Sequence, residues 1–269
     1  MTKLKVLDLF SGLGGISYGL EQTGGFETVA FCDVDETCRK VIRKHWKNAA
    51  IYSDVKIVKA ESICRIVEDS YYRLKENVDL ICGGYPCTGH SVAGKKEGLE
   101  NEASGLWGEY ERIIGEIKPK YVIIENSHNL RSTGLVEVLK ALDARGYNAE
   151  WQIISGYGTG APHQRERIYI VAWRRHLPYP NPFRSWATYS KKEKSKQEWW
   201  SERRFERDAV FGEIPEAQPR VLRDFDGLPK GLQRDLAERI KQLGNSVIPQ
   251  ISKNIGEALL QAEAELKNS

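Results

Sequence analysis

The sequence predicts an α/β protein with a doubly wound, mostly parallel β-sheet. Three observations support this fold class. About six short apolar runs alternate with segments of helical period. The first run, at residues 5–10, leads directly into the turn Ser11-Gly-Leu-Gly-Gly15 and a helical run over 16–22, which is how a nucleotide-binding βα unit begins. The 269 residues suffice for one large domain, alone or with a small second one.

The next two predicted strands carry acidic residues at their ends. The strand at 27–32 is followed by Asp33, about 20 residues beyond the first turn, where a carboxylate can bind ribose hydroxyls. The glycine spacing lacks the pattern that accommodates a pyrophosphate, so an adenosine cofactor without a diphosphate is favoured. After a basic helix over 36–46, residues 53–55 are expected to end a third strand where adenine would lie. An ordinary helix N-cap explains Asp54 equally well.

A cysteine follows the predicted strand at 80–82. Gly83 and Gly84 let the backbone bend, and Pro86 stiffens the approach to Cys87. A thiol held at the mouth of a parallel sheet is well placed to act as a nucleophile. The alternative is a small residue near a strand end, which we expect for the other four cysteines. The polar segment 92–104 is expected to be a loop, either closing over a substrate or simply connecting.

The second half continues the alternation. A helix over 106–117 stops before Pro119, and a strand at 121–124 ends in Glu125, a charge that is costly there unless it has a role or a partner. A helix over 135–142 and strands at 151–154 and 167–172 follow, with a turn over 156–164 between these two strands.

The pattern of residue types changes after residue 173. Basic residues interleave with aromatics over 174–219, which suits contact with phosphates and bases, although a solvated insertion is equally compatible. A turn-rich passage over 220–229, a helix over 232–240 and a patterned helix over 251–262 then return to the core. The predicted boundaries therefore divide the chain into a first domain over 1–173, an insertion over 174–219, and a segment over 220–269 that returns to the first domain.

Composition limits the setting. The net charge of +3 means that affinity for nucleic acid must come from a local patch. Five cysteines without regular spacing argue against a disulfide framework, and Cys32 and Cys38 lack the spacing of a zinc site, so no structural metal is expected. The sequence shows no signal peptide and no bilayer-spanning run, and we expect a soluble intracellular protein.

Five motifs in order along the chain resemble those of the DNA (cytosine-5)-methyltransferases of bacteria and phages. They are Asp8-Leu-Phe-Ser-Gly-Leu-Gly-Gly15, Gly83-Gly-Tyr-Pro-Cys-Thr-Gly-His-Ser91, Glu125-Asn126, Gln164-Arg-Glu-Arg-Ile-Tyr169 and Gly244-Asn-Ser-Val247. The departures are Thr88 and His90 in place of the usual Gln and Phe, Ser127 in place of Val, and Val34 where an aromatic often packs on adenine. The shortened motif over 220–229 is similar to that of small phage-like enzymes.

The resemblance implies the Rossmann-like fold of S-adenosylmethionine-dependent methyltransferases. It assigns catalysis and cofactor binding to 1–173, target recognition to the small insertion over 174–219, and a return to the catalytic domain to 220–269. It implies methyl transfer from S-adenosylmethionine to C5 of a flipped-out cytosine in double-stranded DNA, with Cys87 attacking C6. Glu125 would provide a proton or a hydrogen bond to N3 of the ring, while Arg165 and Arg167 would bind O2 and orient Glu125. The implied cofactor contacts are Phe10, Gly12, Gly14, Gly15, Asp33, Val34, Asp54, Val55, Pro86, Asn245 and Ser246.

The resemblance further implies a cytoplasmic, nucleoid-associated monomer of bacterial or phage origin, and it is compatible with a cognate restriction endonuclease as partner. Two alternatives keep the fold: a tRNA cytosine-5 methyltransferase and a catalytically inactive DNA-binding relative. The glycine spacing disfavours an NAD-dependent oxidoreductase. For Arg165 and Arg167, salt bridges with Glu166 at the surface are the simpler alternative.

Overall fold

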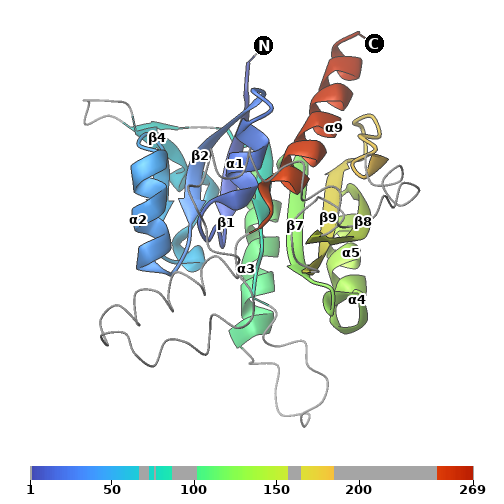
Figure 1. Cartoon of the computed structure of the whole chain (residues 1–269), viewed down its shortest axis with the longest axis horizontal. Coiled ribbons are helices and arrows are strands. Elements are labelled where there is room, and N and C mark those ends of the chain that lie inside the picture. Colours follow the sequence, from blue (N-terminus) through green and yellow to red (C-terminus); the bar gives the residue numbers. More distant parts are fainter. Residues whose placement is uncertain are drawn as a thin grey trace, which may run out of the picture.

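The computed structural model describes residues 2–66, 73–75, 77–86, 102–156, 165–184 and 247–268. Within these ranges one mostly parallel sheet of seven strands forms the centre, in the order β3-β2-β1-β6-β7-β9-β8, and β4 and β5 form a separate antiparallel pair (Figure 1). The strands are β1 (Leu4–Leu9), β2 (Phe26–Cys32), β3 (Ala50–Tyr52), β4 (Cys64–Ile66), β5 (Arg73–Lys75), β6 (Leu80–Gly83), β7 (Tyr121–Ser127), β8 (Tyr147–Ser155) and β9 (Glu166–Arg174).

Helices cover both faces of this sheet. The helices described are α1 (Gly15–Glu21), α2 (Glu36–His45), α3 (Glu102–Ile117), α4 (Leu130–Thr133), α5 (Leu135–Ala144) and α9 (Pro249–Asn268), with short 3-10 turns η1 (Val55–Ile57) and η2 (Ala60–Ser62). Ile123 of β7 packs in the cluster that contains α1 and α9, whereas its neighbour Ile124 packs in the cluster that contains α3 and α5. Because successive strand residues point to opposite faces, the mostly apolar central strands contribute side chains to two cores.

The strand directions confirm the predicted fold class. β1, β2, β3, β6 and β7 pair in parallel, and β9 runs antiparallel to both β7 and β8. β2 and β3 lie on one side of β1, and β6 and β7 lie on the other side. The direction in which successive strands are added to the sheet therefore reverses at β1. In open α/β sheets the carboxyl ends of the strands at such a point form the usual crevice for a ligand.

Most predicted elements are confirmed, with three corrections. The third strand ends at Tyr52 rather than over 53–55, because the Asp54 side chain accepts the Lys56 N–H and starts η1 instead. Helix α3 begins at Glu102, inside the segment 92–104 that was predicted as a loop. Strand β8 begins at Tyr147, four residues before the predicted 151. The pair β4–β5 and the short α4 were not predicted.

The chain beyond β9 stays on the sheet domain for some residues. Leu177 and Phe183 are buried in the cluster formed with α1 and α9. The predicted target-recognition segment from 185 onward and the predicted turns and helix over 220–240 lie outside the described residues, so the three domain boundaries remain predictions. No helix in the described part of the chain is long and apolar enough to cross a membrane.

Candidate active site

The carboxyl ends of the central strands bring the predicted site residues to one edge of the sheet. The turn at 10–15 follows β1, Asp33 follows β2, and residues 84–86 follow β6. Glu125 lies near the end of β7, and β9 starts beside it because Ser127 pairs with Arg167 in the antiparallel register. Cys87, Asn245 and Ser246 lie outside the described residues, as do Thr88 and His90.

The turn after β1 is open and is tied to the end of β2. Gly12 has φ 53° and Gly14 has φ 80°, a left-handed backbone that favours glycine, and Phe10 adopts the same region at φ 51°. The described residues leave the space over Gly12 empty, since no atom lies within 4 Å of a Cβ placed there. The Gly12 N–H donates to Asp33 Oδ2 at 2.7 Å. The turn therefore leaves room above Gly12 and holds the Asp33 carboxylate beside it.

Asp33 and its neighbours fit an adenosine-containing cofactor. Asp33 accepts the Gly12 N–H on one oxygen and the Asp35 N–H on the other, and each oxygen keeps a lone pair for a hydroxyl. Burial raises the pKa of Asp33, although these two N–H donors lower it in part. Val34 is 84% exposed and Phe10 stacks on Tyr110, with ring centroids 6.2 Å apart, so both offer apolar surface at this edge.

The turn that follows β3 is a structural cap as well as a candidate adenine contact. Asp54 Oδ1 accepts the Lys56 N–H at 2.9 Å, which is the N-cap that the sequence left as an equal alternative. Among the described residues this hydrogen bond uses only one carboxylate oxygen of Asp54, so the cap does not exclude a ligand. The Val55 side chain is buried in the hydrophobic cluster that contains α3.

The start of α9 lies against the glycine turn. A Cβ on Gly15 would lie 2.9 Å from the carbonyl oxygen of Val247, so the backbones approach closely there. A Cβ on Gly19 would lie 2.1 Å from the carbonyl oxygen of Pro249. Val247 directly follows the predicted cofactor contacts Asn245 and Ser246. The packing of α1 on α9 thus joins the first motif to the last one.

The segment that leads to Cys87 is held against β7. Gly83 has φ 154°, and a Cβ there would lie 1.9 Å from the carbonyl oxygen of Leu9, so only glycine fits. A Cβ on Gly84 would lie 2.4 Å from Glu125 Oε2. Asn126 Nδ2 donates to the carbonyl oxygen of Tyr85 at 2.9 Å. The chain therefore leaves β6 in direct contact with Glu125 and Asn126, two residues before the predicted nucleophile.

Glu125 is buried and paired with an arginine. Only 9% of Glu125 is exposed, and its Oε1 lies 3.1 Å from Arg167 Nε. Burial raises the pKa of Glu125, and the charges of Arg167 and Arg165 offset part of this rise. Arg167 also donates to the backbone carbonyl of Glu166 rather than to its carboxylate. Burial and the nearby Arg167 lower the pKa of Arg165. The arrangement can deliver a proton or a hydrogen bond from a carboxyl group oriented by a cation.

Three residues with polar contacts at or near the candidate site were not predicted from the sequence. Asn126 was given no role, because its hydrogen bond to the Tyr85 carbonyl depends on a contact between separate strands. Arg112 was also not predicted, because the polar residues around it on α3 are typical of any solvent-exposed helix face. Asp8, a carboxyl within the apolar first strand, was quoted only as part of a motif, yet Ser17 Oγ donates to its buried Oδ2 at 2.7 Å. A charge within an apolar run was the available signal.

Metal ligands do not gather in the part of the chain that the structure describes: no three His, Cys, Asp or Glu side chains come together there.

Residues 4–224 match the family model for the C-5 cytosine-specific DNA methylase. The chain is 37% identical over 174 residues to the Type II methyltransferase M.CviJI of Paramecium bursaria Chlorella virus IL3A, covering 64% of this chain and 43% of that protein. It is 35% identical over 184 residues to the Type II methyltransferase M.Bsp6I of Bacillus sp. strain RFL6, covering 66% and 55%.

Solved structures agree on the fold. A DNMT2 mutant from Spodoptera frugiperda superimposes with a TM-score of 0.54 and 20% sequence identity, over 66% of this chain and 52% of that chain. At this identity the likeness concerns the fold alone. The chain spans about half the length of the curated relatives it matches.

Proposed function

Because the chain belongs to the C-5 cytosine-specific DNA methylase family, we propose that it transfers a methyl group from S-adenosylmethionine to C5 of cytosine in a specific sequence of double-stranded DNA. The observation that carries this proposal is the buried Glu125, paired with Arg167 and in contact with Gly84, three residues before Cys87. The relatives named above are Type II methyltransferases, which supports DNA as the substrate and a restriction endonuclease as a candidate partner.

Cytosine C5 is a weak nucleophile, so the ring must be activated first. The Cys87 thiolate adds to C6, which converts the C5–C6 bond into an enamine and places electron density on C5. Glu125 supports this step by donating a proton or a hydrogen bond to N3, and burial, which raises its pKa, reduces the cost of protonating it. Arg167 orients Glu125, and with Arg165 it offers donors to O2 and favours the thiolate form of Cys87.

The open turn at 10–15 and Asp33 would hold the cofactor, which supplies an electrophilic methyl group when bound. Gly12, Gly14 and Gly15 allow close approach, and Asp33 accepts from the ribose hydroxyls. The remaining proposed contacts are Phe10, Val34, Asp54, Val55, Pro86, Asn245 and Ser246. After methylation a base, which we take to be a water molecule, removes the C5 proton, and the Cys87 thiolate leaves.

The target base must leave the duplex, at a cost of roughly a few kcal/mol. We assign support of this distortion to the loop after Cys87 and to the segment 174–219. We further propose that the protein is a cytoplasmic, nucleoid-associated monomer encoded by a bacterium or a phage. The segment 220–269 would complete the catalytic domain.

Trapping on 5-fluorocytosine tests the proposal. Duplex oligonucleotides with varied contexts and a 5-fluorocytosine are incubated with the protein and S-adenosylmethionine, with Cys87→Ala as the control. A covalent adduct at Cys87 is expected, because fluorine cannot leave as a proton does. Transfer of labelled methyl to tRNA alone would favour the RNA enzyme, and no transfer or adduct with any substrate would favour the inactive relative.

A further inference from the structure

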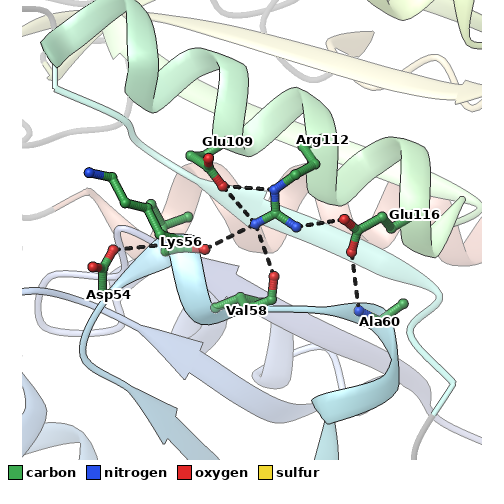
Figure 2. A network of polar contacts seen from close by, with 8 residues as sticks. Asp54, Lys56, Val58, Ala60, Glu109, Arg112 and Glu116 are labelled. Carbon is green, nitrogen blue, oxygen red and sulfur yellow. Dashed lines mark hydrogen bonds and ion pairs between the residues drawn. The ribbon is translucent and has the colours of Figure 1, made fainter.

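The guanidinium of Arg112, on α3, holds the turn that follows β3 (Figure 2). Its Nη2 donates to the carbonyl oxygen of Val55 at 3.3 Å and to that of Val58 at 3.0 Å. Val55 is the first residue of η1, the 3-10 turn that Asp54 caps, and Val58 directly follows this turn. Arg112 therefore connects a helix on one face of the sheet to the candidate adenine contacts, more than 50 residues away along the chain.

Two carboxylates of the same helix orient this guanidinium. Arg112 Nε donates to Glu109 Oε2 at 2.8 Å, and Nη1 donates to Glu116 Oε1 at 2.7 Å. Because a guanidinium is planar and its donors are fixed relative to one another, holding Nε and Nη1 also determines where Nη2 points. Glu116 Oε2 accepts the Ala60 N–H at 3.4 Å, so the same helix face also holds the start of η2. Figure 2 shows this row of contacts along α3.

The turn itself has few internal bonds that define its shape. Among the described residues, the Lys56 N–H donates to the Asp54 side chain, the Ile57 N–H donates to the Asp54 carbonyl at 3.3 Å, and the Val58 N–H donates to the Val55 carbonyl at 3.2 Å. A single 3-10 turn has poor hydrogen-bond geometry and depends on its surroundings. The bonds from Arg112 supply such surroundings.

We propose that Arg112 is a positioning residue for the adenine side of the cofactor pocket, acting by holding Asp54 and Val55 in place. This inference rests on the proposed function, in which these two residues lie against adenine. The carboxylate of Asp54 is suited to accept from the exocyclic 6-amino group. The Arg112 side chain is only 31% exposed and is committed to its two carboxylates and two carbonyls, so it acts through the turn.

Ligand titration of Arg112→Ala and Arg112→Lys tests the inference. Dissociation constants are measured by calorimetry for S-adenosylhomocysteine and for S-inosylhomocysteine, whose base carries an oxo group in place of the 6-amino group. Loss of the hydrogen bonds from a charged donor is expected to weaken binding of S-adenosylhomocysteine about tenfold in Arg112→Ala. The inosyl ligand is expected to weaken less, so the preference for the amino group shrinks. Arg112→Lys should lie between, because one ammonium cannot reach all four acceptors.

Steady-state kinetics and hydrogen exchange give independent readouts. The KM for S-adenosylmethionine should rise while kcat and the KM for DNA stay unchanged. Amide exchange should accelerate over residues 54–60 in Arg112→Ala, where the turn loses its external bonds. As a matched control, Glu111→Gln removes an ion pair of the same helix, 3.0 Å from Arg145, that does not touch the turn. Glu111→Gln should bind both ligands as the wild type does.

The outcomes separate the two proposals. Wild-type affinity and wild-type preference in Arg112→Ala would overturn the positioning role and leave the proposed function intact. Equal weakening of both ligands would also overturn it, because a general loss of structure does not distinguish the 6-amino group. A wild-type protein that binds neither ligand would overturn both proposals. If Arg112→Ala does not fold, Arg112→Lys and Glu109→Gln carry the same comparison, since each removes only part of the network.

Discussion

Asp8 is a buried carboxyl within the apolar strand β1, and replacing it with asparagine should change how stability depends on pH. Its Oδ2 accepts from Ser17 Oγ at 2.7 Å, whereas its Oδ1 has no partner among the described residues. Burial raises the pKa of Asp8 from 3.8 to about 7, although the hydrogen bond from Ser17 lowers it in part. The ionised form of Asp8 is therefore costly in the folded protein.

The sign of the effect follows from proton linkage. The unfolded chain releases the Asp8 proton near pH 4, while the folded chain keeps it until about pH 7. The stability that comes from keeping this proton is fully present below pH 3.8 and is lost as the pH rises to about 7. The gap between the two pKa values corresponds to about 4 kcal/mol of unfolding free energy.

Urea denaturation of the wild type and of Asp8→Asn from pH 4 to pH 8.5 measures this term. Asparagine still accepts from Ser17 but does not ionise, so the free energy of unfolding of the variant, minus that of the wild type, should increase by about 4 kcal/mol across the range. Other titrating groups cancel in this difference. Ser17→Ala serves as a second variant and should move the transition to higher pH. A difference between Asp8→Asn and wild type that does not change with pH would contradict a raised pKa of Asp8 in the folded protein.

Three further predictions concern the site and the helix that supports it. Glu125→Gln should lower kcat by about 100-fold or more, because the amide cannot transfer a proton to N3, while calorimetry should show unchanged binding of S-adenosylhomocysteine; unchanged kcat would remove Glu125 from the mechanism. Gly84→Ala should lower kcat by about 100-fold, since its Cβ would lie 2.4 Å from Glu125 Oε2 and displace that carboxyl, whereas normal turnover would show that the loop adapts. Gly19→Ala should destabilise the fold by about 1–3 kcal/mol, because its Cβ would lie 2.1 Å from the Pro249 carbonyl oxygen; thermal unfolding measures this, and an unchanged midpoint would contradict the close packing of α1 on α9.

Local patterns predicted the elements well where one physical signal dominated. The apolar run of β7 and the helical spacing of α5 were both found, because burial and period are written in neighbouring residues. The predicted end of β3 was wrong because Asp54 is equally compatible with a strand end and with an N-cap, and the contacts around it in the fold determine which one forms. The start of α3 was placed late because residues 102–105 lack a clear apolar period of their own.

The candidate site divides in a similar way. The glycines of the first turn and the carboxyl of Glu125 were identified from the sequence, since residue type and position at a strand end carry chemical meaning. The partner of Glu125 was predicted by resemblance, and its distance of 3.1 Å from Arg167 follows from the antiparallel register of β7 and β9. The roles of Cys87, Asn245 and Ser246 stay predictions, as do the other site assignments.

The fold class, the family motifs and the residue types available for chemistry could be predicted from the amino-acid sequence, because strand and helix periods and glycine turns are local properties of the chain. Which of these groups meet depends on how distant segments pack in the folded protein. The bond from Asn126 to the Tyr85 carbonyl and the contacts of Arg112 with Val55 and Val58 join segments that are 41 to 57 residues apart. Such contacts depend on how whole elements pack, and no local pattern of polarity encodes them.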